Sequence, residues 1–224
     1  MSKNISQNQA MRFGLINDRK KRVKEIIYRL KQLFPKASIA LDYGNNWELL
    51  IAVMLSAQCT DRKVNEVTRR LFKKYRHIDN YASASRRELE RDIYSTGFYR
   101  NKAKNIIAAA QLIQKKFHGR IPKTMPEMLS IPGVARKTAN VVLGNAYGLV
   151  EGIAVDTHVI RLARRWGLSS HTDPIKIERD LMALVPRKDW FHLTYLFIEY
   201  GRKYCSAKPH KHDKCPLRNF DFKT

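Results

Sequence analysis

The chain has 224 residues, which is enough for one large or two small domains with a sizeable buried core. Its 43 lysine and arginine residues exceed its 20 aspartate and glutamate residues, so the net charge is +23, which is unusual for a metabolic enzyme and indicates a polyanionic partner. Three cysteines do not suggest a disulfide framework, and the longest apolar run, Leu49 to Leu55, is too short to span a bilayer.

The hydrophobic pattern predicts helices along the whole chain. Residues 1–17 are polar and are expected to be loosely ordered, and an amphipathic helix follows from Arg22 to Phe34, where Pro35 ends it. Helical periodicity then recurs in six further segments: Trp47–Ser56, Asp61–Tyr75, Ser85–Tyr94, Lys102–Phe117, Ile175–Leu184 and Trp190–Tyr204. No sustained alternation indicates a strand, so the predicted fold class is all-α.

Two short helices joined by a tight turn are predicted around residue 133. Thr124 and Glu127 form a capping box that starts the first helix, and Pro132-Gly133 ends it. From about Arg136, apolar residues recur at helical spacing. The amides at the start of this second helix can bind one backbone phosphate without reading a base, although an ordinary helical turn inside a core is the alternative.

A lysine and an aspartate near this hairpin form a candidate catalytic pair. Lys137 lies just inside the second helix, and Asp156 follows it in the segment Val155-Asp156-Thr157-His158. A buried amine beside Arg136 and the positive end of a helix is favoured in its neutral form, which can attack a sugar carbon. The alternatives are a solvated surface charge for Lys137 and a helix cap for Asp156, and we expect His158 to have a packing or supporting role.

Four motifs in order resemble those of the endonuclease III family, bifunctional DNA glycosylases with AP-lyase activity in the helix–hairpin–helix glycosylase superfamily. They are Leu55–Asp61 (LSAQCTD), Gly97–Ala103 (GFYRNKA), the hairpin with Lys137, and the segment with Asp156. The resemblance runs from about residue 20 to the C-terminus. Together the four motifs are far more specific than any one of them.

The resemblance implies roles for several residues. Lys137 is the Schiff-base lysine, Asp156 the essential carboxylate, Gln58 the side chain that fills the gap left by an extruded nucleotide, and Phe98 an apolar wedge where the family usually has leucine. The other expected DNA contacts are Gly133, Ala135, Arg136, Thr138 and His158. Ala135 replaces a second glycine of the family hairpin, so the backbone there has to avoid positive φ.

The resemblance also implies two helical lobes. Residues 39–150 would form a six-helix barrel-like domain that contains the hairpin, and residues 1–38 would join residues 151–224 in the second domain. The active site would then lie in the cleft between the lobes.

The C-terminal loop departs from the family pattern. The family holds a [4Fe–4S] cluster with four cysteines, and the same spacing here reads Cys205, His212, Cys215 and Asp221. We therefore expect that the cluster is lost and that no cofactor is bound. Zinc at this loop remains an alternative, with His210 as a competing ligand.

The predicted function is excision of oxidised pyrimidines from duplex DNA through a lysine Schiff base, followed by β-elimination at the abasic site. Two alternatives stay open: a monofunctional mismatch glycosylase, and a non-catalytic DNA-binding protein whose hairpin grips phosphates. The expected partner is double-stranded DNA with damaged or abasic nucleotides. We expect a monomer without membrane contact, located in the cytoplasm and, in a prokaryote, on the nucleoid.

Overall fold

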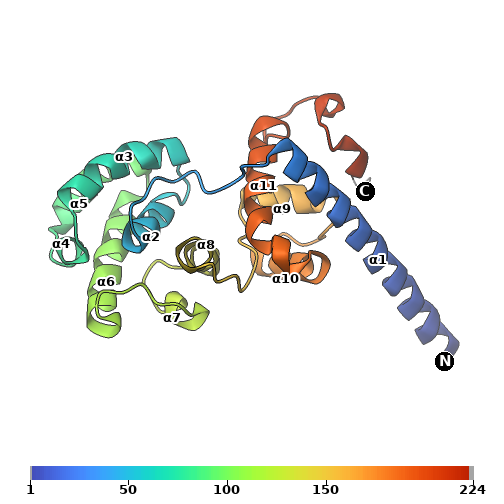
Figure 1. The fold of residues 1–224 in the computed structure, drawn as a ribbon, viewed down its shortest axis with the longest axis horizontal. Helices are drawn as coiled ribbons and strands as arrows, with labels where there is room; N and C mark the ends of the chain where they lie inside the picture. Colours follow the sequence, from blue (N-terminus) through green and yellow to red (C-terminus); the bar gives the residue numbers. More distant parts are fainter. Residues whose placement is uncertain (1, 222–224) are drawn as a thin grey trace. The chain divides into compact units, whose positions relative to one another are not determined.

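The computed structural model describes residues 2–221, with side chains from Asn17 onward. Every regular element in this part of the chain is helical, which confirms the predicted all-α class. The chain divides into two compact units (Figure 1). One consists of Ala40–Glu151, and the other combines the residues up to Ile39 with those from Gly152 onward.

The unit of residues 40–151 is built around helix α2, Asn46–Leu55. Its residues from Trp47 to Leu55 are buried apart from Glu48, and a helix that is apolar on all sides belongs in a core. It packs against α3 (Asp61–Lys74), α6 (Tyr99–Phe117) and α8 (Arg136–Tyr147). The shorter helices of this unit are α4 (Ile78–Ala82), α5 (Arg86–Asp92), α7 (Met125–Leu129) and the 3-10 turn η1 (Tyr94–Thr96).

The second unit packs four longer helices around one core. They are α1 (Ser2–Leu33), α9 (Thr157–Arg165), α10 (Pro174–Leu184) and α11 (Trp190–Lys203). Trp166 lies at the centre, with its ring centroid 5.0 Å from that of Phe197 and 5.3 Å from that of Tyr200. Three 3-10 turns complete this unit: η2 (Arg187–Asp189), η3 (His212–Lys214) and η4 (Arg218–Phe220).

Helix α1 begins much earlier than the sequence pattern predicts. The predicted amphipathic helix starts at Arg22, but the helical backbone starts at Ser2. The expected loose order of residues 1–17 stays a prediction, because the side chains of residues 1–16 lie outside the described part of the structure. Residues 2–21 contain no proline and are rich in good helix formers such as lysine, glutamine, methionine and arginine.

No helix in the described part of the chain combines the length and the apolar character that a membrane crossing requires.

Candidate active site

The two helices of the predicted hairpin are present as α7 and α8. Thr124 caps α7, because its hydroxyl oxygen accepts from the Glu127 amide at 3.4 Å while its O–H donates to the Glu127 carboxylate at 2.7 Å. The turn after α7 is closed by the Val134 amide, which donates to the Ile131 carbonyl at 3.1 Å. The local sequence thus determines both the start and the end of this short helix.

Gly133 is the tightest point of the hairpin. Its φ is +78°, a region that disfavours side chains, and a Cβ built there would lie 2.8 Å from Asn105 Cβ and 2.9 Å from Met54 Cε. The turn can therefore approach α2 and α6 this closely only with glycine at this position. Ala135 lies in the extended region instead, with φ −93° and ψ 170°, so alanine is unstrained where the family has its second glycine.

The start of α8 offers backbone donors to an anion. Ala135 is its N-cap residue and provides no side-chain acceptor, and the first turn contains no acidic residue. The amides of a first helical turn lack partners within the helix and lie at its positive end. Arg136 and Thr138 are half-buried in this turn. This arrangement suits a phosphate.

Lys137 lies in the same turn and is exposed. The expectation that its amine is buried is not met in this structure, because the buried stripe of α8 begins only at Ala139. The exposed amine can meet a ligand that arrives from solution.

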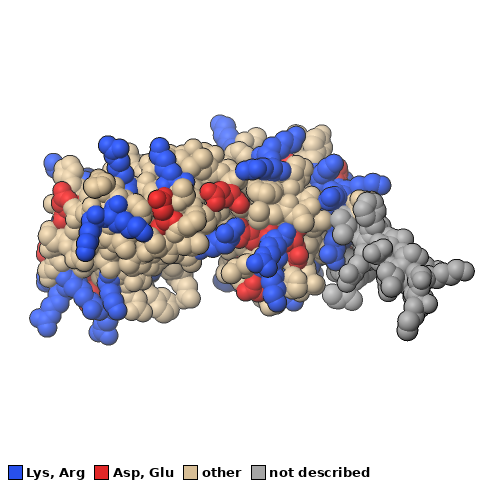
Figure 2. Space-filling model, turned by 90° about the horizontal axis from the view of Figure 1, so that it is seen from below, with Lys and Arg blue, Asp and Glu red and all other residues tan. Residues whose placement is uncertain are grey.

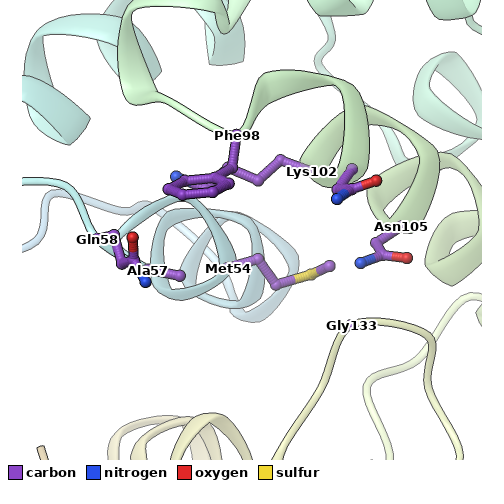
Figure 3. A pocket seen from close by; sticks show the side chains of 8 residues that line it. Met54, Ala57, Gln58, Phe98, Lys102, Asn105 and Gly133 are labelled. Carbon is purple, nitrogen blue, oxygen red and sulfur yellow. The ribbon is translucent and has the colours of Figure 1, made fainter.

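Gln58 and Phe98 lie over one pocket of about 180 Å³. Gln58 follows the end of α2 and Phe98 precedes α6, and both have positive φ, at +52° and +49°. Phe98 is 63% exposed, which rules out a core role for its ring. Figure 3 shows both side chains at the pocket with Met54 and Asn105, which lie toward Gly133 of the hairpin.

Asp156 is the N-cap residue of α9. Its Oδ1 accepts from the Val159 amide at 2.9 Å, so the capping role is real and fixes the direction of the carboxylate. His158 is half-buried, and a Cβ on Gly201 would clash with its ring, so it packs closely on α11. This packing fits the supporting role that we expected for His158.

A cluster of four possible metal ligands lies in the C-terminal loop. The ligand atoms of Cys205, His210, His212 and Cys215 all lie within 4.8 Å of one another. Cys215 Sγ is 3.6 Å from His210 Nε2 and 3.5 Å from His212 Nδ1. His210 Nδ1 donates to the Lys208 carbonyl at 2.8 Å, so the lone pair of the neutral ring is on Nε2, the atom that faces Cys215.

Asp221 does not belong to this cluster. Its two carboxylate oxygens accept from Nε and Nη2 of Arg165 at 2.7 Å and 2.6 Å, a bidentate ion pair that occupies the side chain. Arg165 also contacts His212 Nε2 at 2.9 Å. Burial and the Arg165 charge lower the pKa of His212, which favours its neutral imidazole.

Basic side chains stand out on the surface of both units, with fewer acidic ones between them (Figure 2). This excess of basic side chains on the face seen in Figure 2 favours a polyanion.

Residues 51–187 match the model of the HhH-GPD superfamily of base excision DNA repair proteins. The chain is 50% identical to the endonuclease III of Synechocystis sp. over 89% of its own length and 91% of that protein, and 42% identical to the endonuclease III of Bacillus subtilis over 88% and 90%. It belongs to the endonuclease III family of this superfamily.

Solved structures of the family share the fold. A trapped covalent intermediate of an endonuclease III with DNA superposes with a TM-score of 0.86 at 42% identity, covering 90% of this chain and 95% of that one. A non-covalent endonuclease III–DNA complex gives the same TM-score and identity. A thermostable thymine-DNA glycosylase, at 19% identity and a TM-score of 0.76, shows the same fold.

The prediction that the chain carries no metal or cofactor is wrong. Relatives in the endonuclease III family carry a [4Fe–4S] cluster, and the structure brings together four side chains that can bind a metal. Iron–sulfur clusters of this type are normally held by four thiolates, and the chain does not have this set. Two thiols and two imidazoles are present instead, and both types of ligand are used by zinc.

The spacing of the family motif pointed to Asp221 as a metal ligand and left His210 as a competing one, whereas the fold brings His210 into the cluster and leaves Asp221 out. Sequence reasoning missed part of the pocket. Met54, Lys102 and Asn105 line the pocket but were not singled out. A signal for Lys102 was available, because it falls on the apolar stripe of α6 with Ala103, Ile106 and Ala110, where a lysine is out of place.

Proposed function

We propose that the chain is a DNA glycosylase with AP-lyase activity, that it removes oxidised pyrimidines from duplex DNA, and that Lys137 is its nucleophile. The observation that carries the proposal is the placement of Lys137, exposed in the first turn of α8 directly after a hairpin whose amides suit a phosphate. A phosphate bound there would place the adjoining sugar near the amine.

The reaction follows from the chemistry of an amine and a sugar. The neutral Lys137 amine forms a bond to C1′, and the glycosidic bond breaks as its electron pair leaves with the base, which takes up a proton. The sugar ring opens to give a C1′=N iminium ion. Loss of a C2′ proton then breaks the C3′–O bond and releases the 3′ phosphate oxygen, which is β-elimination.

Asp156 is the proposed carboxylate partner in this reaction. It can take a proton from the lysine before attack and stabilise the positive charge on the sugar. The cap bond to Val159 supports this role, because a carboxylate with a fixed direction needs little reorganisation during the reaction.

Gln58 and Phe98 are the proposed inserting residues. A nucleotide has to leave the stack before its C1′ can be attacked, at a cost of a few kcal/mol. The exposed Phe98 ring can act as a wedge between base steps, and Gln58 can fill the vacated space. Gly133, Ala135, Arg136 and Thr138 would hold the phosphate, His158 would support Asp156, and the site of action would be the DNA of the cytoplasm or nucleoid.

A borohydride trap on abasic duplex DNA tests the proposal. Wild type should form a covalent adduct, and Lys137→Gln should form none. Lys137→Arg is the matched control for charge, because it keeps the phosphate attraction but cannot form a Schiff base, so it should bind DNA and fail to trap. An undiminished adduct in either variant would refute the role of Lys137.

A lesion panel tests the substrate class. Of duplexes with thymine glycol, 8-oxoguanine or a G·T mismatch, the one with thymine glycol, an oxidised pyrimidine, should be cleaved in preference to the other two. Selective cleavage of the G·T duplex without an adduct would favour a monofunctional mismatch glycosylase, and binding without cleavage would favour a DNA-binding protein.

A further inference from the structure

Lys102 in α6 is a buried lysine, only 7% exposed. Its Nζ donates to the carbonyls of Leu55 and Thr96, each at 2.8 Å. Lysine is rarely buried without an acidic partner, and both acceptors here are neutral backbone groups. Burial lowers the pKa of Lys102, because the ammonium ion has lost most of its water. A lysine at a position that disfavours the ammonium ion needs an explanation other than surface charge.

The two acceptors are the last carbonyls of two helical elements. Leu55 ends α2, and Thr96 ends η1. Carbonyls at the C-terminus of a helix have no partner within it, and a positive charge there also interacts favourably with the helix dipole. Neither element has a basic residue of its own in its last turn. The Lys102 ammonium, carried by α6, therefore supplies a hydrogen-bond donor to the C-terminal ends of both α2 and η1.

A strained residue follows each of these two ends. Gln58, three residues after Leu55, has φ +52°, and Phe98, two residues after Thr96, has φ +49°. Residues with side chains persist in this region only when their surroundings hold them there. The backbone of Lys102 also restrains Phe98, because its amide donates to the Phe98 carbonyl at 3.0 Å. Gln58, Phe98 and Lys102 all line the same pocket (Figure 3).

We propose that Lys102 is a positioning residue that holds Gln58 and Phe98 in register for joint insertion into the duplex. The inference rests on the proposed function, in which these two side chains enter the space left by an extruded nucleotide. Lys102 does not touch the reacting atoms in this account. It ties together the two backbone segments that carry the inserting side chains, so that both reach the DNA in one fixed geometry.

The first experiment measures the single-turnover rate of strand cleavage on duplex DNA with an abasic site. Lys102→Met keeps the length of the side chain but removes its donors, and the rate should fall about 10- to 100-fold because small displacements of positioning groups have effects of this size. Lys104→Met is the matched control. It changes an exposed lysine two residues further along the same helix, and its rate should stay within about twofold of wild type.

The second experiment separates positioning from a general structural effect. In a Gln58→Ala/Phe98→Ala background the inserting side chains are gone, so adding Lys102→Met should cause no further loss of rate. A loss of the same size in both backgrounds would overturn the proposal, as would an unchanged rate of Lys102→Met alone. If Lys102→Met does not fold, Lys102→Gln, which keeps two N–H donors, is compared in the same two backgrounds with the same criterion.

Failure of the proposed function would have a different signature. It would appear in the wild type itself as the absence of a borohydride adduct on abasic DNA, whereas failure of the role of Lys102 leaves that adduct intact.

Discussion

Gly133→Ala should destabilise the protein by about 2–4 kcal/mol. An alanine held at φ +78° costs about 1 kcal/mol relative to its preferred regions. Its Cβ would also lie 2.8 Å from Asn105 Cβ and 2.9 Å from Met54 Cε, and overpacking of this kind costs about 1–3 kcal/mol more. Met54 Cε is the end of a flexible side chain and can move, but Asn105 Cβ can move only together with the backbone of α6.

The assay is urea unfolding followed by circular dichroism, in which the midpoint should fall by about 1 M. Ala135→Gly is the matched control, since it makes the reverse change two residues away in a backbone that is already extended. It should lower stability by less than about 1 kcal/mol. A Gly133→Ala protein within about 0.5 kcal/mol of wild type would refute the argument that close packing, rather than ligand binding alone, requires this glycine.

Two further predictions concern Asp156 and the C-terminal loop. Asp156→Asn should keep the helix cap and the fold but reduce the cleavage rate at least about 100-fold, because an amide oxygen accepts the cap bond but does not take up a proton. Asp173→Asn, which changes the N-cap of α10 in the same way, should leave the cleavage rate unchanged. Equal rates for the two variants would contradict the role of Asp156. Elemental analysis of purified wild-type protein should find a stoichiometric metal, and Cys215→Ala should lose it. Cys59→Ala, which changes a cysteine outside the cluster, is the control and should keep the metal. Wild-type protein without metal would contradict the assignment of the cluster.

The helices were predictable where a stripe of apolar residues meets a local start or stop signal. The capping box at Thr124 and the cap at Asp156 were read from side chains whose partners lie only three residues away. Helix α4, with five residues, is too short to show a period and was missed. The early start of α1 was missed for another reason, because Ile5 is the only large apolar residue among residues 2–9, and one apolar residue shows no period.

The candidate site was predictable only where its chemistry is local in sequence. The hairpin and its lysine form one continuous motif, but the ion pair of Arg165 with Asp221 joins residues 56 positions apart. That pairing removes Asp221 from the ligand set and leaves its place to His210, which spacing alone could not show. Lys102 was missed because its acceptors are backbone carbonyls, one of them 47 residues away.

In the proposed reaction one particular amine becomes bonded to the sugar. Peptide mapping by mass spectrometry of the borohydride-reduced adduct, formed with abasic duplex DNA, identifies that amine. The sugar remnant should be attached to Lys137. An adduct on any other lysine, or no adduct at all, would contradict it.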